Sequence, residues 1–241
     1  MKQPLDEREL IVLECLRDSA EPLGSWSLVE HLERRGYRVS SASIGRILYR
    51  LEQRGYVEGQ GNRGRIITKA GVSAIGKTRA FNSMDSHRKD LENLINSKVL
   101  EDFIMVVQAR KAIERETARL AAENITEAGK RELTAILEEQ EVRARRGESI
   151  AEIDIAFHRG IATASRNSAL LALYGILSTM GQQSELFEFV RSRVNAPYRP
   201  AHRSILEAIC SHDPDEAERS MIRHMDALIE DVTKYWDAYR D

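Results

Sequence analysis

Hydrophobic residues recur every three or four positions along most of the chain from residue 99 onward, the period of an amphipathic helix. Proline and glycine are almost absent inside these segments, and no alternating strand pattern competes with them. We therefore expect helices at about 99–123, 126–146, 149–165, 168–192, 198–211 and 214–239. The last has a clear start, with Asp213 as cap, Pro214 at the first helical position and Glu216 at the capping-box position. The pattern predicts an all-helical bundle over residues 99–241, whose core is a natural place for a ligand or a metal ion.

The beginning of the chain predicts two short helices. Residues 6–19 carry an amphipathic pattern, and Asp6 is a possible cap for this first helix. Ser25 is the expected cap of a second helix that runs to about Arg35, and Gly36 then ends it.

A third helix and a hairpin complete this first part of the chain. The helix is expected to start after Ser40 or Ser41 and to stop at Gly55. Its buried face is predicted to consist of Ile44, Ile47, Leu48 and Leu51. The short segments YVEGQ and RIIT follow, joined by a glycine-rich turn at 59–64 that has the composition of a hairpin loop. Three helices and a hairpin are the plan of a winged helix-turn-helix, which we expect over residues 1–70.

The segment between the two parts predicts a linker. Residues 71–98 are polar and have no sustained apolar stripe before Leu91. We therefore expect a partly helical linker over residues 71–98, with the helical bundle beginning at residue 99.

Charge is distributed unevenly between the two parts. The formal net charge is −2, but residues 1–80 hold fourteen lysines and arginines against ten acidic residues. Within residues 34–79 the imbalance is eleven basic residues against two acidic ones. A small basic domain joined to an acidic one is typical of a nucleic-acid reader with a separate partner domain, although charge alone also fits an ordinary solvated surface.

Cysteine content and hydropathy indicate in which cellular compartment the protein is expected. Cys15 and Cys210 lie far apart on apolar helical faces, so they indicate buried thiols in a reducing compartment, not a disulfide framework. No signal peptide opens the chain, and no apolar run approaches the length of a membrane span. We expect a soluble, cytoplasmic protein without a membrane partner.

The third helix of the winged domain supplies candidate DNA contacts. The recognition helix of such a domain enters the major groove, and the hairpin meets phosphates or the minor groove. The outward residues of the helix are Ser41, Ser43, Arg46 and Arg50, and those at the hairpin tip are Asn62, Arg63 and Arg65. A winged helix used only for protein contacts is the alternative, but these polar and basic residues suit DNA better than a dry interface.

A candidate metal site begins in the stretch AEIDIAFHRGIATASRN. Asp154 and His158 are four residues apart, so both lie on one face of a helix next to an apolar stripe. His202 and His224 lie on the apolar faces of two later helices. Carboxylate oxygen and imidazole nitrogen suit a divalent ion, with zinc or nickel first and manganese, cobalt or iron as alternatives. Hydrogen-bonded core histidines are the other interpretation, and the spacing leaves both open.

Two resemblances bear on these alternatives. The stretches GYRVSSASIGRILYRLEQRGYVE and RGRIITKAG resemble the winged-helix domain of NrpR-type archaeal repressors and of ribonuclease R, and not the usual GntR-type DNA-binding domain. The stretches QARKAIERETARLAAENIT, IDIAFHRGIATASRN and AHRSILEAICSHDPDEAERSMIRHM resemble the FCD ligand-binding domain of FadR-subfamily GntR regulators. The expected fold is therefore mainly α, a winged helix-turn-helix followed by an all-α FCD-type bundle.

The second resemblance also implies a ligand set. In that family the matching positions, Asp154, His158, His202 and His224, hold a divalent metal ion, beside which a small organic acid binds. Arg110 matches an arginine that faces the acid, and Asn167 is a further candidate for the same pocket. The alternatives are an ion pair of Arg110 with Glu114 and a helix-capping role for Asn167.

These expectations combine into a one-component transcriptional regulator, not an enzyme. A metabolite bound to the C-terminal bundle would shift the geometry of a homodimer, and the two recognition helices would meet an inverted-repeat operator. Repression is the commoner mode in the resembled family. The alternatives are a metal-dependent hydrolase, for which no general base or nucleophile stands out, and a regulator that senses the metal itself.

Overall fold

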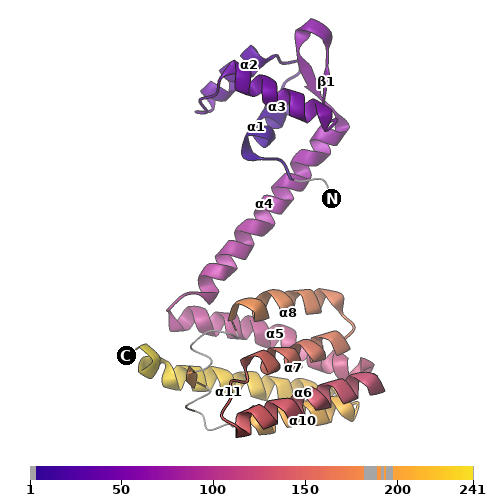
Figure 1. The fold of residues 1–241 in the computed structure, drawn as a ribbon, viewed down its shortest axis with the longest axis vertical. Coiled ribbons are helices and arrows are strands. Elements are labelled where there is room, and N and C mark those ends of the chain that lie inside the picture. Colours follow the sequence, from indigo (N-terminus) through magenta and orange to yellow (C-terminus); the bar gives the residue numbers. More distant parts are fainter. Residues whose placement is uncertain (1–3, 182–188, 191–192, 194–197, 241) are drawn as a thin grey trace. The chain divides into compact units, whose positions relative to one another are not determined.

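A computed structural model describes residues 4–181, 189–190, 193 and 198–240, and it divides the chain into two compact units, residues 1–90 and 91–241 (Figure 1). The described elements of the first unit are α1 (Glu7–Asp18), α2 (Ser25–Arg34), α3 (Ser41–Gln53), β1 (Val57–Gly59), the 3₁₀ turn η1 (Gly61–Arg63), β2 (Arg65–Ile67) and α4 (Lys69–Ile95). Strands β1 and β2 pair antiparallel, with Val57 opposite Ile67. This is the winged helix-turn-helix that the sequence predicted.

Side-chain caps explain where helices α1 and α3 begin. Asp6 accepts a hydrogen bond from the Glu9 backbone, and the Glu9 side chain accepts one from the Asp6 backbone, which makes a full capping box at α1. At α3, the Ser40 side chain accepts a hydrogen bond from the Ser43 backbone, without the reciprocal bond of a capping box. The expectation for α2 was wrong by one residue: Gly24 is the N-cap, without a side-chain bond, and Ser25 is already helical.

The core of the first unit forms where the apolar faces of α1, α2 and α3 meet. The predicted buried face of α3 is confirmed, since Ile44, Ile47, Leu48 and Leu51 are all buried. Helix α4 takes part through Ala74 and Ile75, which belong to the same cluster.

The wing is held close to the loop before α2. Leu23 and Arg65 exchange backbone hydrogen bonds of 3.0 Å in both directions. Gly64 has a φ of +117°, and a Cβ atom there would lie 2.4 Å from the Leu23 carbonyl carbon. Only glycine therefore allows the wing to approach so closely.

Helix α4 runs through most of the segment expected to be a partly helical linker. It is continuous over the 27 residues Lys69–Ile95, and the division between the two units falls inside it, at 90/91. Most residues between 79 and 90 are exposed. The domain boundaries at 70 and 98 remain a prediction.

The second unit is a bundle of helices (Figure 1). Its described helices are α5 (Leu100–Asn124), α6 (Glu127–Arg145), α7 (Ala151–Ala164), α8 (Ser168–Gly181), α10 (Tyr198–Cys210) and α11 (Pro214–Arg240). The all-helical fold class is confirmed. The predicted helix 168–192 matches α8 as far as Gly181, and most of the remainder lies outside the described residues.

The core of this bundle forms between α5, α7, α10 and α11. Phe157, Ile161, Ile205, Met221 and Met225 are each fully buried in it. None of the described helices is both long and apolar enough to cross a membrane.

The start of α11 agrees only in part with the expected capping box. The side chain of Asp213 accepts a hydrogen bond of 2.9 Å from the Glu216 backbone, as a cap should. The Glu216 side chain turns forward along the helix to Arg219, Ser220 and Arg223. The cap is therefore confirmed, but the carboxylate joins an exposed ion-pair network.

Candidate metal centre and nucleic-acid interface

Three histidines from three helices converge inside the second unit. His158 of α7, His202 of α10 and His224 of α11 are 2%, 0% and 5% exposed, and each offers a ring nitrogen within 4.8 Å of the other two. The Nε2 atoms of His202 and His224 are 3.3 Å apart. Two nitrogens bound to one ion at about 2.0–2.1 Å each span up to about 4 Å, so this separation fits a shared ion.

Asp154 lies one helical turn before His158 and is also buried. Its Oδ1 atom is 3.6 Å from Nε2 of His202. The structure thus brings all four predicted metal residues into one region, although the tightest group of possible ligand atoms consists of the three imidazoles.

His158 has one ring nitrogen against a carboxylate and one that no described residue satisfies. Its Nδ1 atom lies 2.6 Å from Oε2 of Glu114, which is short enough for an ion pair but is not aligned as a hydrogen bond. Among the described residues, Nε2 has no hydrogen-bond partner. A buried nitrogen in this situation is costly unless something satisfies it, and a metal ion would.

Burial and neighbouring groups shift the pKa values of His224 and Glu114. Burial lowers the pKa of His224 well below its usual range, and the neighbouring His202 and His158 lower it further. For Glu114, burial alone would raise the pKa, but Arg110 and His158 outweigh burial and bring that pKa to about 2. The lowered pKa of His224 favours a neutral imidazole, the form in which histidine binds a metal ion, and the lowered pKa of Glu114 favours its carboxylate form.

The two residues predicted to contact an effector both have partners within the protein. Nε of Arg110 donates a hydrogen bond of 2.8 Å to Oε1 of Glu114, and both side chains are 2% exposed. Asn167 Oδ1 accepts hydrogen bonds of 3.2 Å from the backbones of Ala169 and Leu170, so it caps α8. These are the alternatives that the sequence left open, and the effector contacts of both residues remain predictions.

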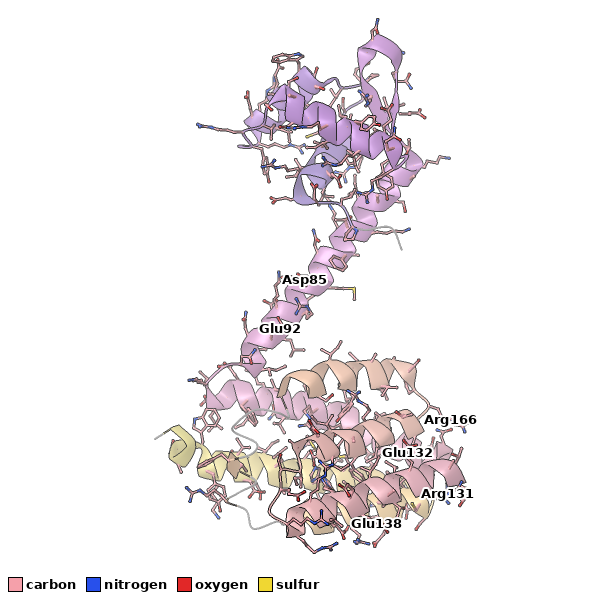
Figure 2. All side chains as sticks on the ribbon, viewed as in Figure 1. Asp85, Glu92, Arg131, Glu132, Glu138 and Arg166 are labelled. Carbon is pink, nitrogen blue, oxygen red and sulfur yellow. The ribbon has the colours of Figure 1, made fainter. Side chains whose placement is uncertain are left out.

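A cavity elsewhere in this unit does not belong to the histidine cluster. It measures about 250 Å³ and lies where the end of α5, the start of α6 and the end of α7 meet, with Glu132 and Arg166 among its lining residues (Figure 2). None of the three histidines lines it.

Gln140 is a residue of the site that the sequence did not reveal. It is 4% exposed, donates through Nε2 to Oδ1 of Asp154 at 3.1 Å, and places Oε1 2.8 Å from Nδ1 of His202. A signal was present in the sequence: Leu133, Leu137 and Gln140 follow the buried period of α6. A polar side chain at such a position needs a buried partner.

The candidate DNA-binding residues of α3 differ in their exposure and in how strongly other residues of the protein hold them. Arg46 is exposed, and its Nη2 atom reaches Ser43 Oγ at a marginal 3.4 Å. Arg50 is instead held by α1, with Nε 3.1 Å from Oε1 of Glu9. Ser41 is half-buried in the first turn of α3. Of the two predicted basic contacts of α3, Arg46 is thus held less by other side chains of the protein than Arg50 is.

The wing shows a similar contrast. Asn62 and Arg63 lie in the turn η1 at the tip of the hairpin, and both are exposed. Arg65, at the start of β2, donates to Oε2 of Glu52 at 2.9 Å. All seven proposed DNA contacts remain predictions.

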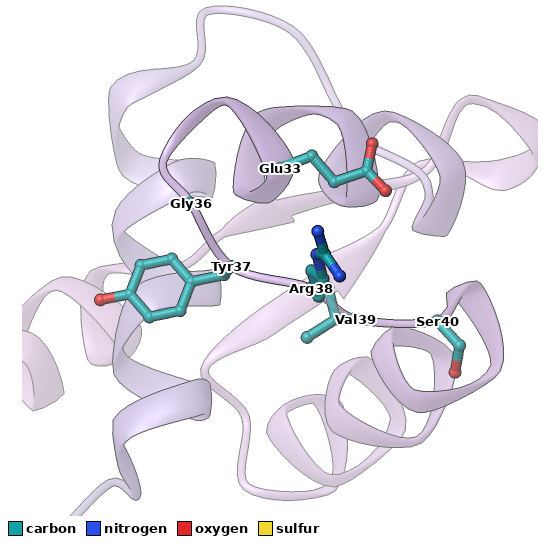
Figure 3. Close-up of a pocket in the computed structure, with 6 residues that line it drawn as sticks. All are labelled: Glu33, Gly36, Tyr37, Arg38, Val39 and Ser40. Carbon is teal, nitrogen blue, oxygen red and sulfur yellow. The ribbon is translucent and has the colours of Figure 1, made fainter.

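Other exposed side chains near α3 were not singled out from the sequence. Tyr49 on α3 is 61% exposed, and Trp26 at the start of α2 is 77% exposed. Arg38 and Tyr37 border a depression along the turn between α2 and α3 (Figure 3). The helical period could have identified Tyr49, since it lies one turn beyond Arg46 on the outward face of α3.

Comparison with known families identifies the second unit. Residues 105–227, which make up just over half of the chain, match the model described as FCD domain. The chain belongs to the FCD-domain family. Residues 10–75 match the model described as ribonuclease R winged-helix domain. Both resemblances inferred from the sequence are therefore confirmed.

The curated relatives of this FCD-domain protein are named as transcriptional regulators. The HTH-type transcriptional regulator LutR of Bacillus subtilis (strain 168) is 30% identical over 137 residues, which cover 55% of this chain and 62% of that protein. The Exu regulon transcriptional regulator of Escherichia coli (strain K12) is 32% identical over 128 residues, covering 50% and 48%. The chain thus spans roughly half to three-fifths of the length of these relatives. They support a GntR-family protein with an FCD domain.

A solved structure shares the fold. The structure described as "Lar controls the expression of the Listeria monocytogenes agr system and mediates virulence" has a TM-score of 0.50 and 11% identity, and the match covers 97% of this chain and 99% of that chain. At this identity the likeness concerns the fold alone.

Proposed function

We propose that this protein is a DNA-binding transcriptional regulator of the GntR family, whose C-terminal bundle binds a divalent metal ion and a small carboxylic acid. The observation that carries the proposal is the convergence of three buried histidines in a chain that also has a winged helix with an exposed basic helix face. The names of the curated relatives support regulation of transcription over an enzymatic role.

The metal site would consist of His158, His202, His224 and Asp154. The donor set of three nitrogens and one oxygen suits zinc or nickel first, and also manganese, cobalt or iron. When bound, such an ion offers a positively charged centre, and the carboxylate of an acid can coordinate to the ion. The unpartnered Nε2 of His158 supports this assignment, because hydrogen bonds within the described protein do not account for it.

The effector would be a small organic acid that binds beside the ion, with Arg110 and Asn167 as its proposed protein contacts. The hydrogen bond to Glu114 uses Nε of Arg110, and a guanidinium carries five N–H donors in all. Asn167 would have to combine effector binding with its role as the cap of α8.

The first unit would bind double-stranded DNA as half of a homodimer. A two-fold dimer presents two α3 helices, so the operator is expected to be an inverted repeat. We expect repression as the mode of action and a cytoplasmic location. Effector binding would change the affinity for DNA only if the acid binds one geometry of the dimer more tightly than the other.

Two measurements on the purified protein test this proposal. The first is elemental analysis before and after chelation, and the second is thermal melting with a panel of small carboxylic acids. We expect about one metal ion per chain, and an acid that raises the melting temperature only in the metal-loaded form. His158→Ala should remove the metal, while His87→Ala, at an exposed position of α4, should retain it. An unchanged metal content in His158→Ala would contradict the site.

A further inference from the structure

Gln140 connects two of the proposed metal ligands that come from different helices. From α6, its Nε2 atom donates to Asp154 Oδ1 on α7 at 3.1 Å, and its Oε1 atom lies 2.8 Å from Nδ1 of His202 on α10. The side chain is only 4% exposed, so bulk water cannot readily replace either contact. One carboxamide therefore constrains two ligands at once.

The chemistry of these groups fixes the orientation of the amide and then the tautomer of the imidazole. A carboxylate only accepts hydrogen bonds, so Gln140 must turn its NH₂ group toward Asp154. Its carbonyl oxygen then faces Nδ1 of His202, and because that oxygen also only accepts, Nδ1 must carry the proton. In a neutral imidazole the lone pair is then on Nε2, the atom 3.3 Å from Nε2 of His224.

Glu114 faces Nδ1 of His158 as Gln140 faces Nδ1 of His202. Two lone pairs 2.6 Å apart would repel, so the proton must lie on Nδ1 of His158, which faces Oε2 of Glu114. The lone pair of a neutral His158 is then on Nε2, the nitrogen for which the described residues offer no hydrogen-bond partner. In their neutral forms both imidazoles thus carry the lone pair on Nε2.

We infer that Gln140 and Glu114 are positioning residues that preset His202 and His158 as Nε2 ligands before the ion binds. This inference rests on the proposed metal site. Carboxylates and carbonyls that hold the second nitrogen of a metal-bound histidine fix its tautomer and ring orientation, and their loss typically weakens metal binding about 10–100-fold.

Gln140 is the better residue to test, because Glu114 is also bound to Arg110 and its removal would disturb a second buried group. Gln140→Met removes both contacts at similar volume. Gln140→Glu keeps an acceptor for Nδ1 of His202 but loses the donor to Asp154. Glu138→Gln, at an exposed position of the same helix, is the control (Figure 2).

Two measurements on the full-length protein test the inference. In the metal-free form, ¹⁵N NMR of the His202 ring should show a proton on Nδ1 in the wild type and in Gln140→Glu, and a mixture of tautomers in Gln140→Met. In the second measurement, Co²⁺ affinity by chelator competition should fall about 10–100-fold in Gln140→Met and remain unchanged in Glu138→Gln.

The outcomes separate this inference from the proposed function. If the wild type binds Co²⁺ and Gln140→Met binds it equally well with the same tautomer, the positioning role is overturned and the metal site stands. If the wild type binds no Co²⁺, the metal site is overturned and the inference falls with it. Should Gln140→Met fail to fold, Gln140→Glu decides: a His202 proton that moves to Nε2 in that variant overturns the inference.

Discussion

The buried ion pair of Arg110 with Glu114 leads to a prediction about stability. Pairs four residues apart on an exposed helix contribute about 0.3–0.5 kcal/mol. This pair is different, because its atoms are 2.8 Å apart and both side chains are 2% exposed. Arg110→Met leaves the Glu114 carboxylate buried beside His158 without its guanidinium partner. Removal of one partner of a buried pair typically costs about 3–5 kcal/mol, a large part of the stability of about 5–15 kcal/mol of an ordinary domain.

Urea unfolding of the metal-free protein measures this cost. The two tryptophans divide between the units: Trp26 is exposed in the first, and Trp236 is buried in the second. In a Trp26→Phe background, fluorescence therefore reports on the second unit. We expect Arg110→Met to lower the unfolding free energy by about 3–5 kcal/mol, and Arg110→Met/Glu114→Gln to lose less than the sum of the two single changes.

Arg119→Met is the matched control, since Arg119 lies on the same helix in partly exposed pairs with Glu116 and Glu123. It should leave the unfolding curve nearly unchanged. The reasoning fails if Arg110→Met unfolds within about 0.5 kcal/mol of the wild type, the range expected of ordinary surface changes. In that case Arg110 would not be held for stability, and its role as an effector contact would gain support.

Three further predictions follow from the fold and the site. Chelation should lower the melting temperature of the second unit by roughly 5–10 °C, if metal had been present at about 100 times its dissociation constant, and calorimetry measures this shift. Arg46→Ala should weaken operator binding by about 1–3 kcal/mol at matched salt without a change in melting temperature; wild-type affinity in gel shifts would argue against a recognition role. Gly160→Ala should destabilise the second unit by about 1–3 kcal/mol, because a Cβ atom would lie 2.5 Å from Leu133 Cδ2. Gly175→Ala, also in a helix but with nothing within 4 Å of a new Cβ, should not be destabilised in chemical denaturation.

The sequence was sufficient for most of the elements and for the buried placement of the histidines, because both follow from periodicity. A helix places residues three and four apart on one face, so His158 and His224 could be assigned to buried faces without knowledge of the fold. The position of the α2 cap could not be assigned in this way, because Gly24 and the adjacent serine are both acceptable N-caps.

Partners distant in the sequence could not be predicted from spacing. Arg50 was expected to face DNA, yet its ion pair is with Glu9, which lies 41 residues earlier. Gln140 and His202 are 62 residues apart, and only the packing of α6 against α10 brings them together. The period of a helix shows which face is buried, but it does not show which side chain of another helix will be opposite.

The arrangement of the core argues that the proposed ion is not needed for folding. Small domains that depend on zinc have little other core and unfold without it. Here many apolar side chains are fully buried, among them Phe157, Ile161, Ile205 and Met221. The hydrophobic effect therefore favours packing of these helices in the absence of metal. Gln140 and Glu114 would already hold two imidazoles in place in that state. Far-UV circular dichroism should therefore show full helical content after chelation, with only the melting temperature reduced. A loss of helical signal at 25 °C would instead make the ion a structural element, and a role for it in binding an effector would then need separate proof.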